Sequence, residues 1–171
     1  MNDLQKAVSL LIKGEVIVLP VEGTYCYVAD PFNETAVSKL MALKSQHAKP
    51  VMLIGDLEDL PRFVNGFSDT EEQAIMNNWP GEVTICFASI QQGVNTKLQY
   101  GNKKIALRVP SSDYVLEVLH AVGQPLASLV VYNENMPAKD RRDLFGIDNF
   151  TLRIPNSLSG NIGETIEWQN F

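Results

Sequence analysis

Short apolar blocks separated by polar residues predict the first elements of the chain. The apolar residues near the N-terminus recur at helical spacing and are Leu4, Ala7, Val8 and Leu11. This spacing predicts an amphipathic helix. Residues 15–19 form a short β-branched block that predicts a strand. Residues 36–44 carry another apolar stripe at helical spacing, and the apolar block 51–54 predicts the next strand. The N-terminal third therefore predicts a strand, helix, strand unit.

The middle of the chain begins with a signature of a helix start. Ser68 and Glu71 have the spacing of a capping box, in which each side chain satisfies an orphan backbone N–H. We expect this helix to run to about residue 78, where Trp79-Pro80-Gly81 ends it. Residues 83–87 and 105–109 then form two short apolar blocks on either side of a polar loop. Both blocks predict strands.

The last predicted helix begins at Ser111 or Ser112 and runs through Val122, and Gly123 ends it in the left-handed conformation. Residues 126–131 predict a further strand. Because most strands lack a polar face, we expect an α/β sheet covered by helices on both sides. The close succession of strands between residues 83 and 109 favours a twisted mixed sheet of parallel and antiparallel strands. With no repeat or linker, the sequence predicts a single domain over residues 1–171.

Composition limits the class of partner. The chain has 171 residues, 45% of them hydrophobic, which is enough to bury a core. It carries 14 Lys and Arg against 20 Asp and Glu, a formal net charge of -6. A chain of this charge is no polycation that coats nucleic acid, so we expect no DNA partner. Any site for an anion must therefore be local.

Cysteine usage and hydropathy point to a reduced, cytoplasmic protein. Cys26 and Cys86 form no CxxC pair, and His47 and His120 lie far from them in sequence. This arrangement supplies no ligand set for a structural zinc, and we identify no metal ligand among the side chains. The longest apolar runs are far below the roughly 20 residues that a membrane span needs, so we expect no membrane partner.

Common signatures of nucleotide and hydrolase sites are missing. The chain contains neither G-x-G-x-x-G after a strand nor G-x-x-x-x-G-K-[ST], so the sequence supports neither a dinucleotide site nor a P-loop. It also lacks a G-x-S-x-G elbow and an H-E-x-x-H helix. The spacing of the Ser, His and Asp residues singles out no nucleophile.

Five motifs occur in order along the chain. They are LPVEGTY at residues 19–25, Lys44 with Lys49-Pro50, WPGEVT at 79–84, ALRVP at 106–110 and GQPLAS at 123–128. Together they resemble the bacterial threonylcarbamoyl-AMP synthase family, the YrdC-like domain. The resemblance implies a YrdC-like fold with a concave, positively lined cavity. It implies synthesis of threonylcarbamoyl-AMP from L-threonine, bicarbonate and ATP for modification of tRNA, with tRNA or other tRNA-modification proteins as partners.

The resemblance carries six residues over to the site. Lys44, Lys49 and Arg108 are implied as catalytic residues, and the same three with Glu22, Tyr25 and Ser128 as the substrate and ATP-binding set. The family chemistry explains the cations, because a carbamate oxygen is already anionic when it attacks the α-phosphate. Lys and Arg, with Mg²⁺, hold the polyphosphate and stabilise the pyrophosphate leaving group.

The departures from the family pattern fall on the ligand-binding motifs. Val21 stands where the family has Thr, and Cys26 and Val28 stand where it has Gly. Gln46 replaces an arginine, which removes a bidentate charged fork. Residues 129–132 replace T-S-A-N of the motif S-T-S-A-N, and the segment 160–168 is matched to the last strand of the family. We expect weaker ATP affinity from these losses.

Several residues also have a structural interpretation. Lys44 lies at a predicted helix C-terminus, where any cation is favourable. Arg108 lies in an apolar strand and needs either a carboxylate partner such as Glu22 or a cavity. Tyr25 either covers the ligand or fills the core, and Ser128 is either a ligand donor or a strand-end hydroxyl. The function classes are accordingly an active synthase, a catalytically degenerate relative that binds nucleotide or RNA, and an unrelated α/β binding protein.

Overall fold

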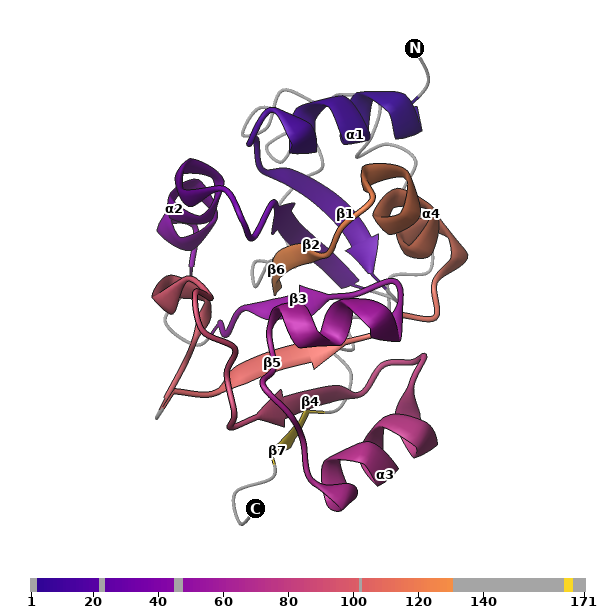
Figure 1. Cartoon of the computed structure of the whole chain (residues 1–171). Helices are drawn as coiled ribbons and strands as arrows, with labels where there is room; N and C mark the ends of the chain where they lie inside the picture. Colours follow the sequence, from indigo (N-terminus) through magenta and orange to yellow (C-terminus); the bar gives the residue numbers. More distant parts are fainter. Residues whose placement is uncertain (1–2, 22–23, 45–47, 102, 131–164, 168–171) are drawn as a thin grey trace.

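The structure is a computed structural model that describes residues 3–21, 24–44, 48–101, 103–130 and 165–167 (Figure 1). The helices are α1 (Asp3–Ile12), α2 (Glu34–Ala42), α3 (Asp69–Asn78) and α4 (Asp113–Val122), with the 3-10 helices η1 (Leu57–Arg62) and η2 (Thr96–Leu98). The strands are β1 (Ile17–Val21), β2 (Thr24–Ala29), β3 (Val51–Leu53), β4 (Thr84–Phe87), β5 (Ile105–Arg108), β6 (Leu126–Val130) and β7 (Thr165–Glu167).

The described strands form one sheet in the order β1-β2-β6-β3-β5-β4-β7. The pairs β3/β5 and β4/β7 are parallel, and the other neighbours are antiparallel. The prediction of a mixed α/β sheet is therefore confirmed. β7 lies within the segment 160–168 that the family resemblance matched to the last strand.

The predicted strand, helix and strand at the N-terminus are found as β1, α2 and β3, but the prediction lacked β2 between them. β2 pairs antiparallel with β1, from Ile17 opposite Val28 to Val21 opposite Thr24. A signal for this strand was present, since residues 24–28 are β-branched, aromatic or apolar and follow Gly23. The motif LPVEGTY covers residues 19–25, so the same residues serve both a family motif and the hairpin of β1 and β2.

Local capping fixes the helix ends as predicted. Ser68 Oγ accepts a hydrogen bond from the Glu71 backbone N–H at 3.1 Å, and Glu71 Oε1 accepts from the Ser68 N–H at 2.8 Å. Trp79 caps the C-terminus of α3, and Gly123 ends α4 with a φ of 81°, a left-handed conformation that glycine adopts cheaply. Both helix stops are confirmed.

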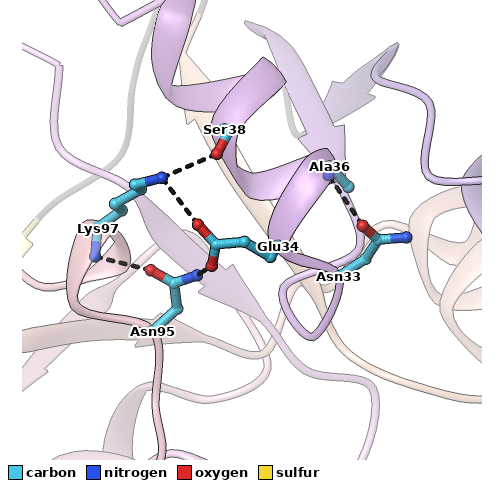
Figure 2. A network of polar contacts seen from close by, with 6 residues as sticks. All are labelled: Asn33, Glu34, Ala36, Ser38, Asn95 and Lys97. Atoms are coloured by element: carbon cyan, nitrogen blue, oxygen red, sulfur yellow. Dashed lines mark hydrogen bonds and ion pairs between the residues drawn. The ribbon is translucent and has the colours of Figure 1, made fainter.

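A network of polar contacts joins the start of α2 to η2 (Figure 2). Glu34 accepts hydrogen bonds from Lys97 Nζ at 2.8 Å and from Asn95 Nδ2 at 2.5 Å. Lys97 Nζ also donates to Ser38 Oγ at 2.8 Å. The long connection between β4 and β5 is thereby attached to a helix that is distant in sequence.

The two faces of the sheet carry different clusters. On one face, which we call the Phe63 face, Met52, Ile85, Leu107 and Leu129 pack with buried residues of α2, η1 and α3. On the opposite face, which we call the Arg108 face, Leu19, Val28, Leu53 and Leu126 pack under α1 and α4. Since successive residues of a strand point to opposite faces, each strand contributes to both layers. Figure 1 shows α1 and α4 together beside β1.

Candidate functional site

Buried polar residues concentrate on the Arg108 face. Among the described residues, four buried side chains are polar or charged, namely Glu71, Thr84, Arg108 and Ser128. Glu71 belongs to the capping box of α3. The register places the other three on one face, because Ser128 lies opposite Val51, Val51 opposite Ala106, and Ala106 opposite Cys86. The polar part of this face therefore spans β6, β3, β5 and β4.

Arg108 occupies the centre of this polar surface. It lies opposite Leu53 of β3, and its side chain is 5% exposed. Its Nε donates to the carbonyl oxygen of Gly81 at 2.9 Å, while the Gly81 N–H donates to the Val109 carbonyl at 2.9 Å. The first bond fixes the Nε edge of the guanidinium against the Trp79-Pro80-Gly81 segment, and the second ties the same segment to the end of β5.

Glycine is required at position 81 because the backbone passes close to the carbonyl of Asn78. A Cβ at this position would lie 2.8 Å from the carbonyl oxygen of Asn78, which is too short for a side chain. Trp79 supports the same segment, because its Nε1 donates to the Val83 carbonyl at 2.8 Å and its ring packs against Phe87. The helix stop predicted from sequence therefore has a second role, which is to hold Arg108.

The positive charge of Arg108 affects the Cys26 thiol on β2. Burial raises the pKa of the Cys26 thiol to about 12, and the guanidinium of Arg108 lowers it only in part. The thiol is therefore neutral near pH 7. Cys26 lies opposite Val130 on the Arg108 face, so an uncharged thiol and an apolar side chain border the polar region on this side.

Lys49 contacts the same face through Tyr100. Its Nζ is 4.7 Å from the centroid of the Tyr100 ring, and the Tyr100 hydroxyl donates to Cys86 Sγ. Cys86 lies opposite Ala106 and therefore shares a face with Arg108. The structure thus brings two of the three expected catalytic cations to one side of the sheet, although 59 positions separate them along the chain.

Ser128 is buried at the same face, where its hydroxyl donates to the Val51 carbonyl at 2.7 Å. This bond joins β6 to β3 through a side chain. The hydroxyl proton is thus already used within the sheet, which favours the structural interpretation, whereas the oxygen keeps lone pairs that can accept a hydrogen bond. A role as ligand donor stays a prediction.

The structure does not bring every expected site residue to this face. Tyr25 precedes Cys26 in β2, so its side chain points to the opposite face, where it packs against the Phe63-face cluster. This placement favours the core-filling interpretation of Tyr25. Lys44 is exposed just beyond α2, a helix that packs on the Phe63 face, and its part in the site stays a prediction. Glu22 and Gln46 lie outside the described residues.

Tyr100, Cys86 and Thr84 were missed as members of this surface by sequence reasoning. Thr84 had a signal, because it closes the family motif WPGEVT, of which only Trp79-Pro80-Gly81 was given a role, as a helix stop. Tyr100 had none, since it is an isolated aromatic residue in a polar loop. Its position depends on a backbone bridge to Lys104 and on the hydroxyl contact with Cys86, neither of which a pattern predicts.

Over the described part of the chain, no group of three His, Cys, Asp or Glu side chains is placed to hold a metal ion. Mg²⁺ commonly takes only one or two carboxylates and completes its shell with substrate phosphates and water. None of the helices described is long and apolar enough to cross a membrane.

The fold and this surface define a class: an α/β protein with an oriented arginine and a lysine on one face of a mixed sheet. A family model described as Sua5/YciO/YrdC, telomere recombination, matches residues 9–142. The chain belongs to this family. It is 33% identical over 132 residues to the threonylcarbamoyl-AMP synthase of Photobacterium profundum, covering 75% of this chain and 71% of that protein. It is 30% identical over 166 residues to the protein of the same name from Hahella chejuensis, covering 92% and 88%.

Solved structures agree on the fold. The crystal structure of E. coli YciO matches with a TM-score of 0.67 at 21% identity, covering 96% of this chain and 76% of that chain. P. abyssi Sua5 complexed with L-threonine matches with a TM-score of 0.67 at 19% identity, covering 75% and 38%. The chain thus spans little more than a third of that protein. These likenesses confirm the expected YrdC-like fold.

Proposed function

We propose that the chain is an L-threonylcarbamoyladenylate synthase that makes threonylcarbamoyl-AMP from L-threonine, bicarbonate and ATP. The threonine amine and bicarbonate first give a carbamate and water. A carbamate oxygen then attacks the α-phosphate of ATP, the bond to the β-phosphate breaks, and pyrophosphate leaves. Family membership and the curated relatives that carry this name support the proposal.

The observation that carries the proposal is the buried, oriented Arg108 with Lys49 on the same face. The reaction needs no protein nucleophile, because the attacking oxygen is already an anion. It needs positive groups that hold anionic substrates and stabilise the charge that develops on the leaving group. An arginine fixed before binding costs little reorganisation, so its charge acts fully in the transition state.

The proposal also includes the remaining site residues, the metal ion and the use of the product. Lys44 and Glu22 complete the substrate site, and Mg²⁺ arrives as the complex of ATP rather than on a protein site. The product serves the threonylcarbamoyl modification of adenosine in tRNA, in the cytoplasm, with tRNA or a tRNA-modification protein as partner. Residues 1–171 act as a single domain.

The test is pyrophosphate release by the full chain with ATP, L-threonine and bicarbonate. We expect release only when all three are present and strong loss in Arg108→Ala. Arg62→Ala is the matched control, because this arginine is exposed and lies over the Phe32 ring, outside the polar surface. Release that does not depend on threonine, or that survives in Arg108→Ala, contradicts the proposal.

One observation favours a second candidate, a relative that binds nucleotide without turnover. Val130 stands in the place of the second serine of the family motif, on the same face as Ser128, and Cys26 lies opposite it. Position 130 therefore offers no hydroxyl donor to a ligand. Measured ATP binding without pyrophosphate release would establish this alternative.

A further inference from the structure

Tyr100 joins three separate segments of the polar surface. Its backbone forms an antiparallel bridge with Lys104, with N···O distances of 2.9 and 3.0 Å. Its hydroxyl donates to Cys86 Sγ, and Cys86 is buried in β4. The face of its ring meets Lys49 Nζ at 4.7 Å from the centroid. The ring is thus held at both ends, and its face is presented to an exposed lysine.

We infer that Tyr100 is a positioning residue for Lys49: the ring, fixed by Cys86, holds the ammonium over the Arg108 face so that it meets the substrate polyphosphate. This inference rests on the proposed function. Neither the motifs nor the family match assigns any role to Tyr100.

The physical reason is the conformational freedom of lysine. An exposed lysine samples many rotamers, and binding a phosphate requires one of them, which costs affinity. A cation over an aromatic face is attracted by the ring quadrupole, which favours the rotamers that keep Nζ near the ring. The attraction leaves the positive charge of Lys49 intact, so the ammonium group keeps its capacity to donate hydrogen bonds.

The residues next to Lys49 in sequence also favour an orientation of its side chain toward the Arg108 face. Ala48 and Pro50 on either side are buried, while Lys49 itself is exposed. Val51, the first residue of β3, lies opposite Ala106 and Ser128 on the Arg108 face. Buried neighbours therefore fix the backbone of Lys49, and the Tyr100 ring restricts the position of its Nζ. Arg108 is fixed by Gly81 in a comparable way, so both cations are oriented before a ligand binds.

The experiment measures ATP affinity by calorimetry in the full chain, in a double-mutant cycle of Tyr100→Leu and Lys49→Gln. We expect Tyr100→Leu to weaken ATP binding about two- to fivefold, the range of an exposed cation–π pair. In the Lys49→Gln background the same change has no further effect. Tyr100→Phe keeps the ring face and retains most of the affinity. Phe67→Leu, which removes an exposed aromatic ring elsewhere, is the matched control and leaves affinity unchanged.

A second readout does not depend on nucleotide. Reductive ¹³C-dimethylation makes the lysine side chains visible by NMR, and the Lys49 signal is the one that is lost in Lys49→Gln. A ring over Lys49 shifts this signal in the wild-type protein and in Tyr100→Phe but not in Tyr100→Leu. Equal loss of ATP affinity in both Lys49 backgrounds, or an unshifted Lys49 signal in the wild type, overturns the inference. Wild-type ATP binding with no loss in Tyr100→Leu overturns the inference alone. A wild-type chain that binds no ATP contradicts the proposed function, and the inference fails with it.

Discussion

The Phe63 face and the Arg108 face are built from the same strands, yet they bury different chemistry. On the Phe63 face, the buried side chains of β3 to β6 are apolar and pack against α2, η1 and α3. On the Arg108 face, the apolar layer under α1 and α4 covers β1, β2 and part of β3 and β6. Beyond it lie Thr84, Arg108 and Ser128. Alternation along each strand lets one residue stabilise the fold while the next serves a site.

The two faces also differ in how they meet the requirements of burial. An apolar side chain needs only close packing, whereas a buried charge needs a fixed polar partner. For Arg108 this partner is the Gly81 carbonyl, which depends on the tight backbone path after α3. The Arg108 face therefore needs polar partners that the Phe63 face does not. We expect Phe63→Ala to change mainly the free energy of unfolding and Arg108→Ala to change mainly the affinity for ATP.

The largest expected effect belongs to the Phe63 face. Phe63 is 1% exposed, and Phe63→Ala is expected to lower the free energy of unfolding by about 3–5 kcal/mol, because it removes packing and leaves a cavity. Urea denaturation measures this change. ATP affinity of the folded fraction stays near wild type. A large loss of affinity in folded protein would mean that the two faces are coupled.

Arg108→Ala is expected to show the reverse pattern. ATP binding weakens by about 2–4 kcal/mol, since a charge-assisted contact in a desolvated site is lost. This corresponds to roughly 30- to 1000-fold in affinity, measured by calorimetry. Arg108→Lys keeps a charge but not the fork and recovers only part of the affinity. An unchanged affinity in a folded variant would make Arg108 a structural residue.

Ser128→Ala separates the two interpretations of this hydroxyl. Loss of its bond to the Val51 carbonyl is expected to destabilise the fold by about 1 kcal/mol, seen as a lower Tm. If the hydroxyl serves the sheet alone, ATP affinity does not change. A drop in affinity without a change in Tm would instead identify Ser128 as a ligand donor.

The smallest expected effect lies outside both faces, in the network of Figure 2. Hydrogen bonding and ion pairing with Lys97 hold the pKa of Glu34 below its ordinary value of 4.5. A lowered carboxyl pKa stabilises the fold above the unfolded-state pKa, and this stability is lost as pH falls through the folded-state pKa. Because Glu34 is exposed, Glu34→Gln should lower Tm only slightly at pH 7, and the difference should vanish well below pH 4.5. A difference that persists in acid would contradict the ion-pair explanation.

Sequence patterns by themselves determined the local elements of this protein. The capping box at Ser68, the stop at Trp79-Pro80-Gly81 and the left-handed Gly123 each depend on residues within a few positions, so they were predicted and are found. The order of the motifs also indicated the family, which the comparisons confirm. The hairpin of β1 and β2 was accessible in principle but was missed, because one stretch served both a strand and a motif.

Only the tertiary structure decided which of the named residues share a surface. The sheet order brings β6, β3, β5 and β4 together, and this non-local pairing places Lys49 with Arg108 and turns Tyr25 to the other face. The contact of Tyr100 with Cys86 joins residues of two segments that no periodicity relates. Local propensity acts over a few residues. Register and strand order instead arise because both faces of the sheet must be buried at the same time, and this happens only in the folded chain.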